Sequence, residues 1–232
     1  MEKTKHIVIL AAGDFPSHET PLRVLREADF VVCCDSAYTQ FSIFNSQFSI
    51  PFVVIGDGDS LSDETKQELG DRWIEVTEQD YNDLHKAMLW ATSKFSISHS
   101  RFSILGATGR REDHTLGNIS YLATFAKEYP GIDLEMLTDY GRFSIIGVNP
   151  SNTQEFTHSN IYTFPSFTRQ QVSFFTLDPR TRVSAKGLQW PLDHACLSPW
   201  WHGTLNAALS DTFTVTSDGP LIIFQTFDAK PL

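Results

Sequence analysis

The stretch that decides the fold is Pro51-Phe52-Val53-Val54-Ile55-Gly56-Asp57-Gly58-Asp59-Ser60. Its first half is short, continuous and apolar, which is typical of a parallel strand buried on both faces. Its second half places two carboxylates, separated by one glycine, just beyond that strand. Ligands of open α/β sheets bind outside the carboxyl ends of the strands, and paired carboxylates suit Mg²⁺. The same residues also fit a plain polar turn before a helix.

Strand-like and helix-like segments alternate through the first part of the chain. Expected strands cover 6–10, 30–34, 51–55, 73–76, 102–105, 134–137 and 143–148, and expected helices cover 22–27, 62–69, 82–93 and 114–127. This alternation predicts a mostly parallel, Rossmann-like sheet that is covered by helices on both faces.

The pattern changes at the turn formers Asn149-Pro150-Ser151-Asn152. Beyond them we expect strands at 161–164, 172–177, 213–216 and 221–227, with no convincing helical period. Short strands separated by turn residues are typical of an antiparallel sandwich or small barrel. The sequence therefore predicts two domains, an α/β domain over 1–150 and an all-β sandwich over 151–232.

Composition limits the classes of partner. The 232 residues carry a formal net charge of −10, which argues against a sequence-independent nucleic-acid binder, because such proteins need a cationic surface. No apolar segment approaches the length that spans a bilayer, and the start of the sequence lacks the features of a signal peptide. The chain has three cysteines, and the adjacent pair Cys33 and Cys34 in an expected strand suggests buried thiols in a reducing compartment. We expect a cytoplasmic protein with no membrane partner.

The tripeptide Phe-Ser-Ile begins at positions 41, 48, 95, 102 and 143. The flanking residues do not match and the spacing is irregular, so the recurrence does not indicate a repeat architecture. Its composition is compatible with strands.

A second acidic cluster is Asp80-Tyr81-Asn82-Asp83, which is followed by Lys86. In a purely structural role, Asp80 or Asn82 caps the next helix, and Asp83 lies in its first turn, where the helix dipole favours negative charge. In a chemical role, Asp80 and Asp83 complete a metal site with the first two aspartates. Lys86, one helical turn after Asp83, then points at a phosphate.

A third cluster, Gly106-Ala107-Thr108-Gly109-Arg110-Arg111-Glu112-Asp113-His114, lies between an expected strand and an expected helix. Glycines and a helix N-terminus can present N–H groups to phosphate, and Arg110 and Arg111 can neutralise a transferring phosphoryl group. Asp113 can cap the helix, bind metal or orient a hydroxyl. The passage matches neither a Walker A loop nor the dinucleotide fingerprint, so it is weak evidence by itself.

The three clusters are stronger together than separately. Each follows a strand of one parallel sheet, so the three should meet at one edge. Carboxylates, a lysine, arginines and a glycine loop match the needs of phosphoryl transfer from a nucleotide, which depends on positioning and charge neutralisation around Mg²⁺.

The ordered motifs resemble those of the thiamin pyrophosphokinase family. They are the segments 56–60, 80–87 and 105–114 with Asn118, then Gly187-Leu188-Gln189-Trp190-Pro191-Leu192, Gly203-Thr204-Leu205-Asn206 and Ser217-Asp218-Gly219-Pro220-Leu221. The resemblance implies an enzyme that moves a pyrophosphoryl group from ATP to the hydroxyl of thiamin and releases AMP. It also implies a catalytic α/β domain, a thiamin-binding and dimerisation sandwich, and a homodimer.

The resemblance also assigns roles to residues. Asp57, Asp59 and Asp83 would hold Mg²⁺ and the phosphates. The nucleotide and the reacting groups would be lined by Asp80, Lys86, Thr108, Gly109, Arg110, Arg111 and Asp113, and thiamin would face Trp190, Thr204 and Asn206.

Other interpretations remain open at this point. Trp190 can instead be a core residue of the sandwich, and Trp200 and Trp201 are further candidates for a thiamin contact. A metal-dependent phosphoesterase also uses aspartates, but a two-metal site of that kind usually needs several histidines, and only His114 lies in a cluster. A non-catalytic nucleotide or thiamin sensor is a third possibility, although binding a cationic ring needs no metal site.

Overall fold

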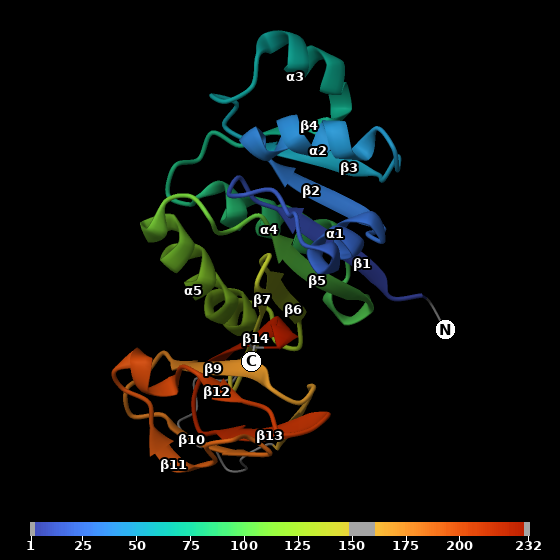
Figure 1. Cartoon of the computed structure of the whole chain (residues 1–232). Helices are drawn as coiled ribbons and strands as arrows, with labels where there is room; N and C mark the ends of the chain where they lie inside the picture. Colours follow the sequence, from blue (N-terminus) through green and yellow to red (C-terminus); the bar gives the residue numbers. More distant parts are fainter. Residues whose placement is uncertain (1–2, 149–160, 230–232) are drawn as a thin grey trace. The chain divides into compact units, whose positions relative to one another are not determined.

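A computed structural model describes residues 3–148 and 161–229. The chain divides into two compact units, one formed by Met1–Tyr121 with Gly131–Asp139 and the other by Leu122–Pro130 with Tyr140–Leu232 (Figure 1). The turn-forming residues 149–152, where we predicted a domain boundary, lie outside the described residues. That boundary stays a prediction.

A six-stranded parallel sheet forms the framework of the first unit. Its strands, in spatial order, are β6 (Asp133–Leu137), β5 (Ser100–Leu105), β1 (Lys5–Leu10), β2 (Phe30–Cys34), β3 (Phe52–Gly56) and β4 (Trp73–Glu75). The central strands are buried on both faces, as the continuous apolar runs predicted. The α/β fold class expected for this part of the chain is confirmed.

The order of the strands reverses once within this sheet. The chain passes from β1 through β2 and β3 to β4 at one edge, and then returns to place β5 on the other side of β1. Right-handed crossovers place helices on opposite faces when the direction reverses. The loops after β1 and β5 therefore diverge at a switch point, which is where α/β sheets bind ligands.

Helices connect the strands. They are α1 (Glu19–Arg26), α2 (Tyr38–Asn45), α3 (Asp63–Leu69), α4 (Asp83–Lys94) and α5 (Glu112–Glu128), with short 3₁₀ turns at Asp35–Ala37, Gly70–Arg72 and Ile97–His99. Helix α4 packs on β1, β2 and β3 through an apolar face that includes Leu84, Ala87, Met88 and Ala91. The sequence analysis did not predict α2, although Tyr38, Phe41 and Phe44 have the i, i+3 spacing of one helix face.

The second unit is a sandwich of antiparallel strands. One layer has the order β12 (Asn206–Ala207), β9 (Gln170–Thr176), β14 (Leu221–Ala229), β7 (Gly141–Ile146), and the other has β11 (Leu192–Cys196), β10 (Arg182–Lys186), β13 (Thr212–Ser217), β8 (Tyr162–Pro165). A 3₁₀ turn spans Trp200–Gly203. Alternate residues such as Val172, Phe174, Phe213 and Val215 form the core between the layers. The predicted sandwich is confirmed, although β10, β11 and β12 had not been expected.

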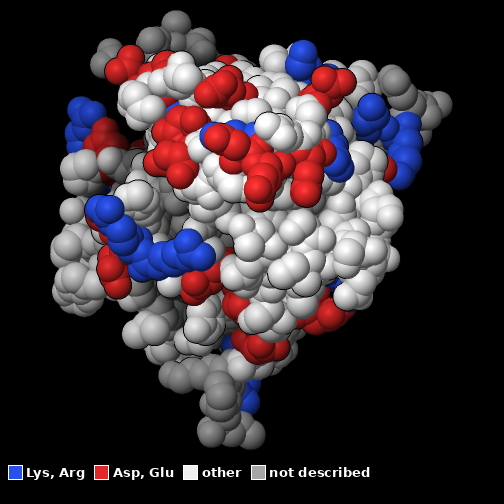
Figure 2. All heavy atoms as spheres, turned by 90° about the horizontal axis from the view of Figure 1, so that it is seen from above, with Lys and Arg blue, Asp and Glu red and all other residues white. Residues whose placement is uncertain are grey.

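The acidic net charge is visible on the surface. Figure 2 looks down on the end that carries α3, and acidic side chains are prominent on this face. Helix α3 itself begins with Asp63 and Glu64. Among the described residues, no helix is long and apolar enough to cross a membrane.

A polar network lies inside the first unit, between β1, β5 and β6. The Nε2 atom of His6 is 2.9 Å from Oγ of Ser103, whose hydroxyl donates to Oε1 of Glu135 at 2.9 Å. Arg101 donates to the same Glu135 oxygen at 2.7 Å. Burial, and secondarily the charge of Arg101, lowers the pKa of His6 from 6.5. The folded chain therefore disfavours protonation of this imidazole relative to the unfolded chain.

We predict that acid destabilises the fold through His6. The folded chain binds a proton at His6 less well than the unfolded chain does. Below pH 6.5 the unfolded chain becomes protonated at His6, so the free energy of unfolding decreases, whereas above that pH it is unaffected by His6. Urea unfolding at pH 7.5 and pH 5.5 should show a smaller acid loss for His6→Gln than for the unsubstituted chain. Equal losses in both proteins would contradict the assignment.

Candidate active site

A cavity of about 400 Å³ lies at the switch point of the first unit. The loop after β1, the loop after β5 and the N-terminal turn of α4 all contribute to it. Its lining comprises Ala11, Ala12, Gly13, Cys34, Asp57, Gln79, Tyr81, Asn82, Asp83, Leu84, Lys86, Ala107, Thr108, Arg110, Arg111, His114, Thr115 and Asn118. Segments from all three predicted clusters thus meet in one cavity.

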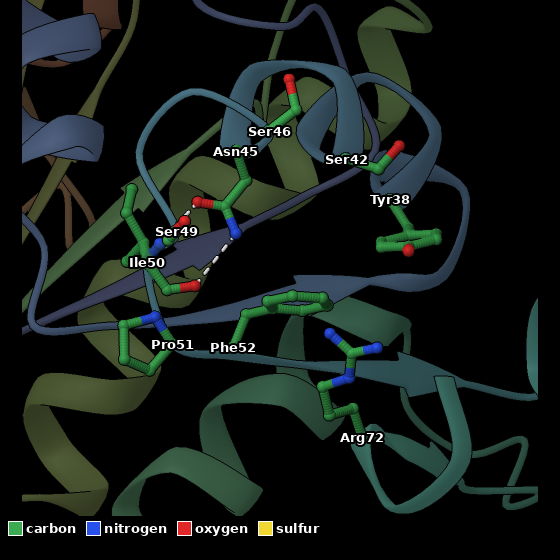
Figure 3. A pocket seen from close by; sticks show the side chains of 9 residues that line it. All are labelled: Tyr38, Ser42, Asn45, Ser46, Ser49, Ile50, Pro51, Phe52 and Arg72. Carbon is green, nitrogen blue, oxygen red and sulfur yellow. Dashed lines mark hydrogen bonds between the residues drawn. The ribbon is translucent and has the colours of Figure 1, made fainter. Parts of the chain in front are cut away.

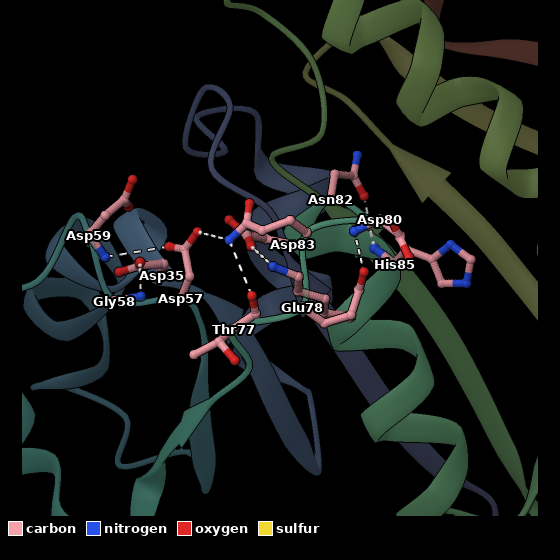
Figure 4. A network of polar contacts seen from close by, with 12 residues as sticks. Asp35, Asp57, Gly58, Asp59, Thr77, Glu78, Asp80, Asn82, Asp83 and His85 are labelled. Atoms are coloured by element: carbon pink, nitrogen blue, oxygen red, sulfur yellow. Dashed lines mark hydrogen bonds and ion pairs between the residues drawn. The ribbon is translucent and has the colours of Figure 1, made fainter.

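Three carboxylates gather beside this cavity. One oxygen from each of Asp35, Asp57 and Asp59 lies within 4.8 Å of the others, an arrangement that could hold a metal ion (Figure 4). Asp57 Oδ2 also accepts a hydrogen bond from the Gln79 amide at 3.2 Å, which is the main reason why its pKa is lowered. We did not predict Asp35 as a site residue, although it follows β2 just as the other two follow β3.

Helix α4 presents to the cavity an ion pair between a buried lysine and a partly exposed aspartate. Asn82 caps this helix by accepting a hydrogen bond from the backbone N–H of His85, so the capping role falls to Asn82. Lys86 Nζ is 3.6 Å from Asp83 Oδ1, and its side chain is only 3% exposed. Burial raises the pKa of Asp83, and Lys86 partly opposes this shift. The buried ammonium of Lys86 can also bind an anionic ligand that enters the cavity.

Four of the predicted residues lie outside the cavity lining. Asp59 belongs to the carboxylate group, and Asp80 is exposed beside Glu78. Gly109 lies in the loop before α5, and Asp113 lies in the first turn of that helix. Asp113 forms an exposed ion pair with Arg111 at 2.6 Å, and this arginine lowers the pKa of the carboxyl to about 2. Asp113 therefore positions a lining arginine.

The loop after β5 is tied to the loop after β1. The N–H of Gly13 donates to Gly106 O at 2.6 Å, and the N–H of Asp14 donates to Thr108 O at 2.9 Å. Gly109 has φ of +95°, and a Cβ there would lie 2.2 Å from Asp14 Oδ2, so only glycine fits. Asn118 braces the same loop by donating to Ala107 O at 2.8 Å.

A second cavity, of about 310 Å³, lies in the sandwich unit. It is lined by Phe174, Trp190, Leu192, His202, Gly203, Thr204, Leu205 and Asn206. The three residues predicted to face thiamin are therefore neighbours. Trp190 is 56% exposed, so its interpretation as a core residue of the sandwich is wrong.

Asn206 holds the backbone that carries Trp190. Its side-chain oxygen accepts from the N–H of Trp190 at 3.1 Å and from that of Ala207 at 2.9 Å, and its amide donates to Trp190 O at 2.7 Å. With three hydrogen bonds and 6% exposure, Asn206 positions the indole. Thr204 donates to Trp201 O at 2.8 Å, which closes the neighbouring turn.

A third hollow, of about 470 Å³, lies between α2 and β3 in the first unit (Figure 3). Several of its polar side chains form hydrogen bonds within the protein. The side-chain amide of Asn45 donates to Ile50 O and accepts from the N–H of Ile50. The hydroxyls of Ser42 and Ser46 donate to backbone carbonyls three residues earlier in the chain. These three side chains therefore have most of their hydrogen-bonding capacity occupied within the protein.

Comparison with known families gives a consistent result for both halves. Residues 22–134 match the family model described as thiamin pyrophosphokinase, catalytic domain. Residues 156–224 match the model described as thiamin pyrophosphokinase, substrate-binding domain. The chain belongs to the thiamin pyrophosphokinase family.

Individual relatives agree with this membership. Thiamine pyrophosphokinases 1 and 3 of Oryza sativa subsp. japonica are 29% and 30% identical over 184 and 185 residues, which is 74% of this chain. The matched region spans 64% of the length of each rice protein.

Solved structures show the same fold. The thiamine pyrophosphokinase of Bacillus subtilis matches 97% of this chain and all of its own, with a TM-score of 0.73 at 20% identity. The thiamin pyrophosphokinase of Candida albicans matches 97% of this chain and 90% of its own, with a TM-score of 0.74 at 17% identity.

We predict that Asn206→Ala destabilises the sandwich unit. Loss of the buried amide leaves the N–H and carbonyl of Trp190 without these partners, which typically costs about 1–3 kcal/mol. Urea unfolding should show the loss, and tryptophan fluorescence of the folded protein should shift as the Trp190 segment loosens. Gln189→Ala, an exposed neighbour, is the control, and equal effects of the two substitutions would contradict the role of Asn206.

Proposed function

We propose that this protein transfers a pyrophosphoryl group from ATP to the hydroxyl of thiamin, producing thiamin diphosphate and AMP. The observation that carries the proposal is the cavity of the first unit. There, carboxylates, a buried lysine, two arginines and a glycine loop meet at the switch point of a parallel sheet. We assign ATP to the domain over 1–150, and thiamin and dimerisation to the domain over 151–232.

The residues around the cavity fit a divalent cation. The grouped carboxylates of Asp35, Asp57 and Asp59 supply hard oxygen ligands, and one buried oxygen of Asp35 has no hydrogen-bond partner among the described residues. We propose Mg²⁺ as the cofactor, held by Asp57, Asp59 and Asp83. When bound, this ion neutralises charge on the phosphates of ATP.

The protein's own cations and N–H groups orient the polyphosphate. Lys86 points into the cavity from α4, and Arg110 and Arg111 reach it from the loop that also carries Thr108. In this proposal they hold the transferring group in line with the attacking hydroxyl. The low pKa of Asp113 makes it a weak base. In this proposal Asp113 arranges the nucleotide side of the site through Arg111, and Asp80 lies on the same side.

Thiamin fits the cavity of the sandwich unit by its chemistry. Thiamin carries a cationic aromatic ring, and the face of an indole attracts such cations. Trp190 offers an exposed indole beside Thr204, whose hydroxyl oxygen can accept a further hydrogen bond. Asn206 holds the indole in place, as described above.

We also propose a homodimer in the cytoplasm. Large exposed apolar side chains of the sandwich unit, including Trp190, Trp201, Leu205 and Leu209, support association with a second copy. The free thiols of Cys33, Cys34 and Cys196 support a reducing compartment.

The metal-dependent phosphoesterase is the less favoured alternative. Within the described residues, the group able to hold a metal consists of aspartates alone, without the histidines that a two-metal hydrolase usually needs.

The deciding experiment measures AMP released from Mg-ATP with and without thiamin. We expect AMP to appear only when thiamin is present, in equal amount to thiamin diphosphate. Release of inorganic phosphate without thiamin would indicate a hydrolase instead, and binding without turnover would indicate a sensor.

The Asp59→Asn variant is the matched control for this assay. We expect it to lose nearly all turnover and to keep its far-ultraviolet circular dichroism, because it removes one charge at an exposed position. Full activity of this variant would contradict the assignment of the carboxylates.

We predict that Trp190→Ala weakens the binding of thiamin more than the binding of ATP. Removing the indole removes the face that contacts the cationic ring, so KM for thiamin should rise roughly tenfold, in line with about 1–2 kcal/mol for a desolvated cation–π contact. KM for ATP should change little. Gln189→Ala, at a position outside the cavity lining, is the comparison variant. Equal increases in KM for thiamin and for ATP in Trp190→Ala would refute the assignment.

A further inference from the structure

The loop after β1 is held by a carboxylate that lies outside the sequence motifs. This residue, Asp139, is found two residues beyond the end of β6. Its Oδ1 atom accepts hydrogen bonds from the backbone N–H of Ser17 at 2.9 Å and from that of His18 at 3.0 Å. Its Oδ2 atom accepts from the Ser17 hydroxyl. One carboxylate thus receives donors from two consecutive residues of a loop that is distant in the sequence.

These contacts favour the ionised form of Asp139. Partial burial by itself would raise the pKa of this carboxyl, but the hydrogen bonds from Ser17 and His18 outweigh that effect and lower the pKa from 3.8. A carboxylate suits the position, because it offers two acceptor oxygens and no donor. Hydrogen bonds to an ionised acceptor are also stronger than those between neutral groups. At neutral pH the loop is therefore anchored to a charge.

The anchored loop forms one wall of the cavity in the first unit, because residues 11–13 line that cavity. The N–H groups of Gly13 and Asp14 tie the first part of the loop to the loop after β5. Asp139 ties its last part, immediately before α1 begins. The cavity wall is therefore fixed from the ends of two neighbouring strands, β5 and β6.

Apolar contacts support the middle of the loop. Pro16 is buried, and the ring centroid of Phe15 lies 5.8 Å from that of Phe44. Such contacts are non-directional, whereas the hydrogen bonds to Asp139 fix the direction of two peptide groups. A displacement of about 1 Å in a substrate-positioning segment can cost a large factor in activity, so the anchor bears on the ligand in the cavity.

We propose that Asp139 is a positioning residue for the nucleotide site. It does not line the cavity, and it acts by holding residues 11–13 at the place where they contact the nucleotide. This inference rests on the proposed function for the identity of the ligand, ATP, whereas the anchoring of the loop does not depend on it.

The first test measures the dissociation constant of Mg-ATP for the full chain by isothermal titration calorimetry. Asp139→Ala removes every acceptor offered to Ser17 and His18, and we expect Mg-ATP to bind roughly tenfold more weakly. Asp139→Asn keeps one acceptor oxygen, so it should show a smaller loss, and it replaces the alanine variant if that variant does not fold. In the turnover assay KM for ATP should rise while KM for thiamin stays constant. Unchanged affinity for Mg-ATP would overturn the proposal.

The matched control is Asp29→Ala. Asp29 belongs to the same unit and also accepts a backbone N–H, that of His6 at 2.8 Å, but it precedes β2 at the amino edge of the sheet. We expect this variant to melt at a lower temperature and to bind Mg-ATP as the unsubstituted chain does. An equal loss of Mg-ATP affinity in both variants would indicate general destabilisation and would overturn the positioning role.

Hydrogen exchange without ATP tests the anchor separately from the ligand. The N–H groups of Ser17 and His18 should exchange faster in Asp139→Ala, because they lose their acceptor, whereas those of β1 should exchange as before. Equal exchange at Ser17 and His18 in both proteins would overturn the proposal. A chain that shows this exchange difference and the loss of Mg-ATP affinity, but no thiamin-dependent release of AMP, would refute the proposed function and leave this inference standing.

Discussion

The fold holds like-charged carboxylates close together at the carboxyl edge of a parallel sheet. Asp35, Asp57 and Asp59 approach one another within 4.8 Å although they repel. They stay there because each follows a buried strand that cannot move without breaking the core, and because the N–H of Gly58 is donated to Asp35. The stability of the sheet thus compensates for electrostatic repulsion at its edge, which the proposed cation would reduce.

The reversal of strand order explains why the remaining polar groups reach the same place. Strands β1 and β5 are neighbours, but the chain segments that leave them run in different directions, so a cavity opens between their loops. The hydrogen bonds from Gly13 and Asp14 to the loop after β5 fix the width of this opening. Helix α4 then contributes Lys86 from the side, and its burial keeps the ammonium directed inward.

Buried strands and the convergence of three polar clusters could be predicted from the sequence, because both follow from apolar runs that end in polar turns. The Phe-Ser-Ile tripeptide shows where this reasoning stops. At 41–43 it is helical and at 102–104 and 143–145 it forms strands, whereas at 48–50 it lies in a turn and the loop that follows it. Tertiary packing decides among these conformations, since aromatic and β-branched residues carry only a weak local preference. Asp35 was missed as a site residue for a related reason, because its partner is the backbone N–H of Gly58, which no side-chain motif reveals.

Motif residues need not all touch a ligand. In the sandwich unit the indole of Trp190 is exposed. The side chain of Asn206 is buried and forms hydrogen bonds with the backbone N–H and carbonyl of Trp190. In the α/β unit Asp113 pairs with Arg111, which lines the cavity, while Asp113 itself does not. In each pair, one residue lines the cavity and the other fixes the orientation of the first. A substitution at the second kind of position should therefore act through the geometry of the first, so the sequence alone predicts the place of the site better than the role of each residue in it.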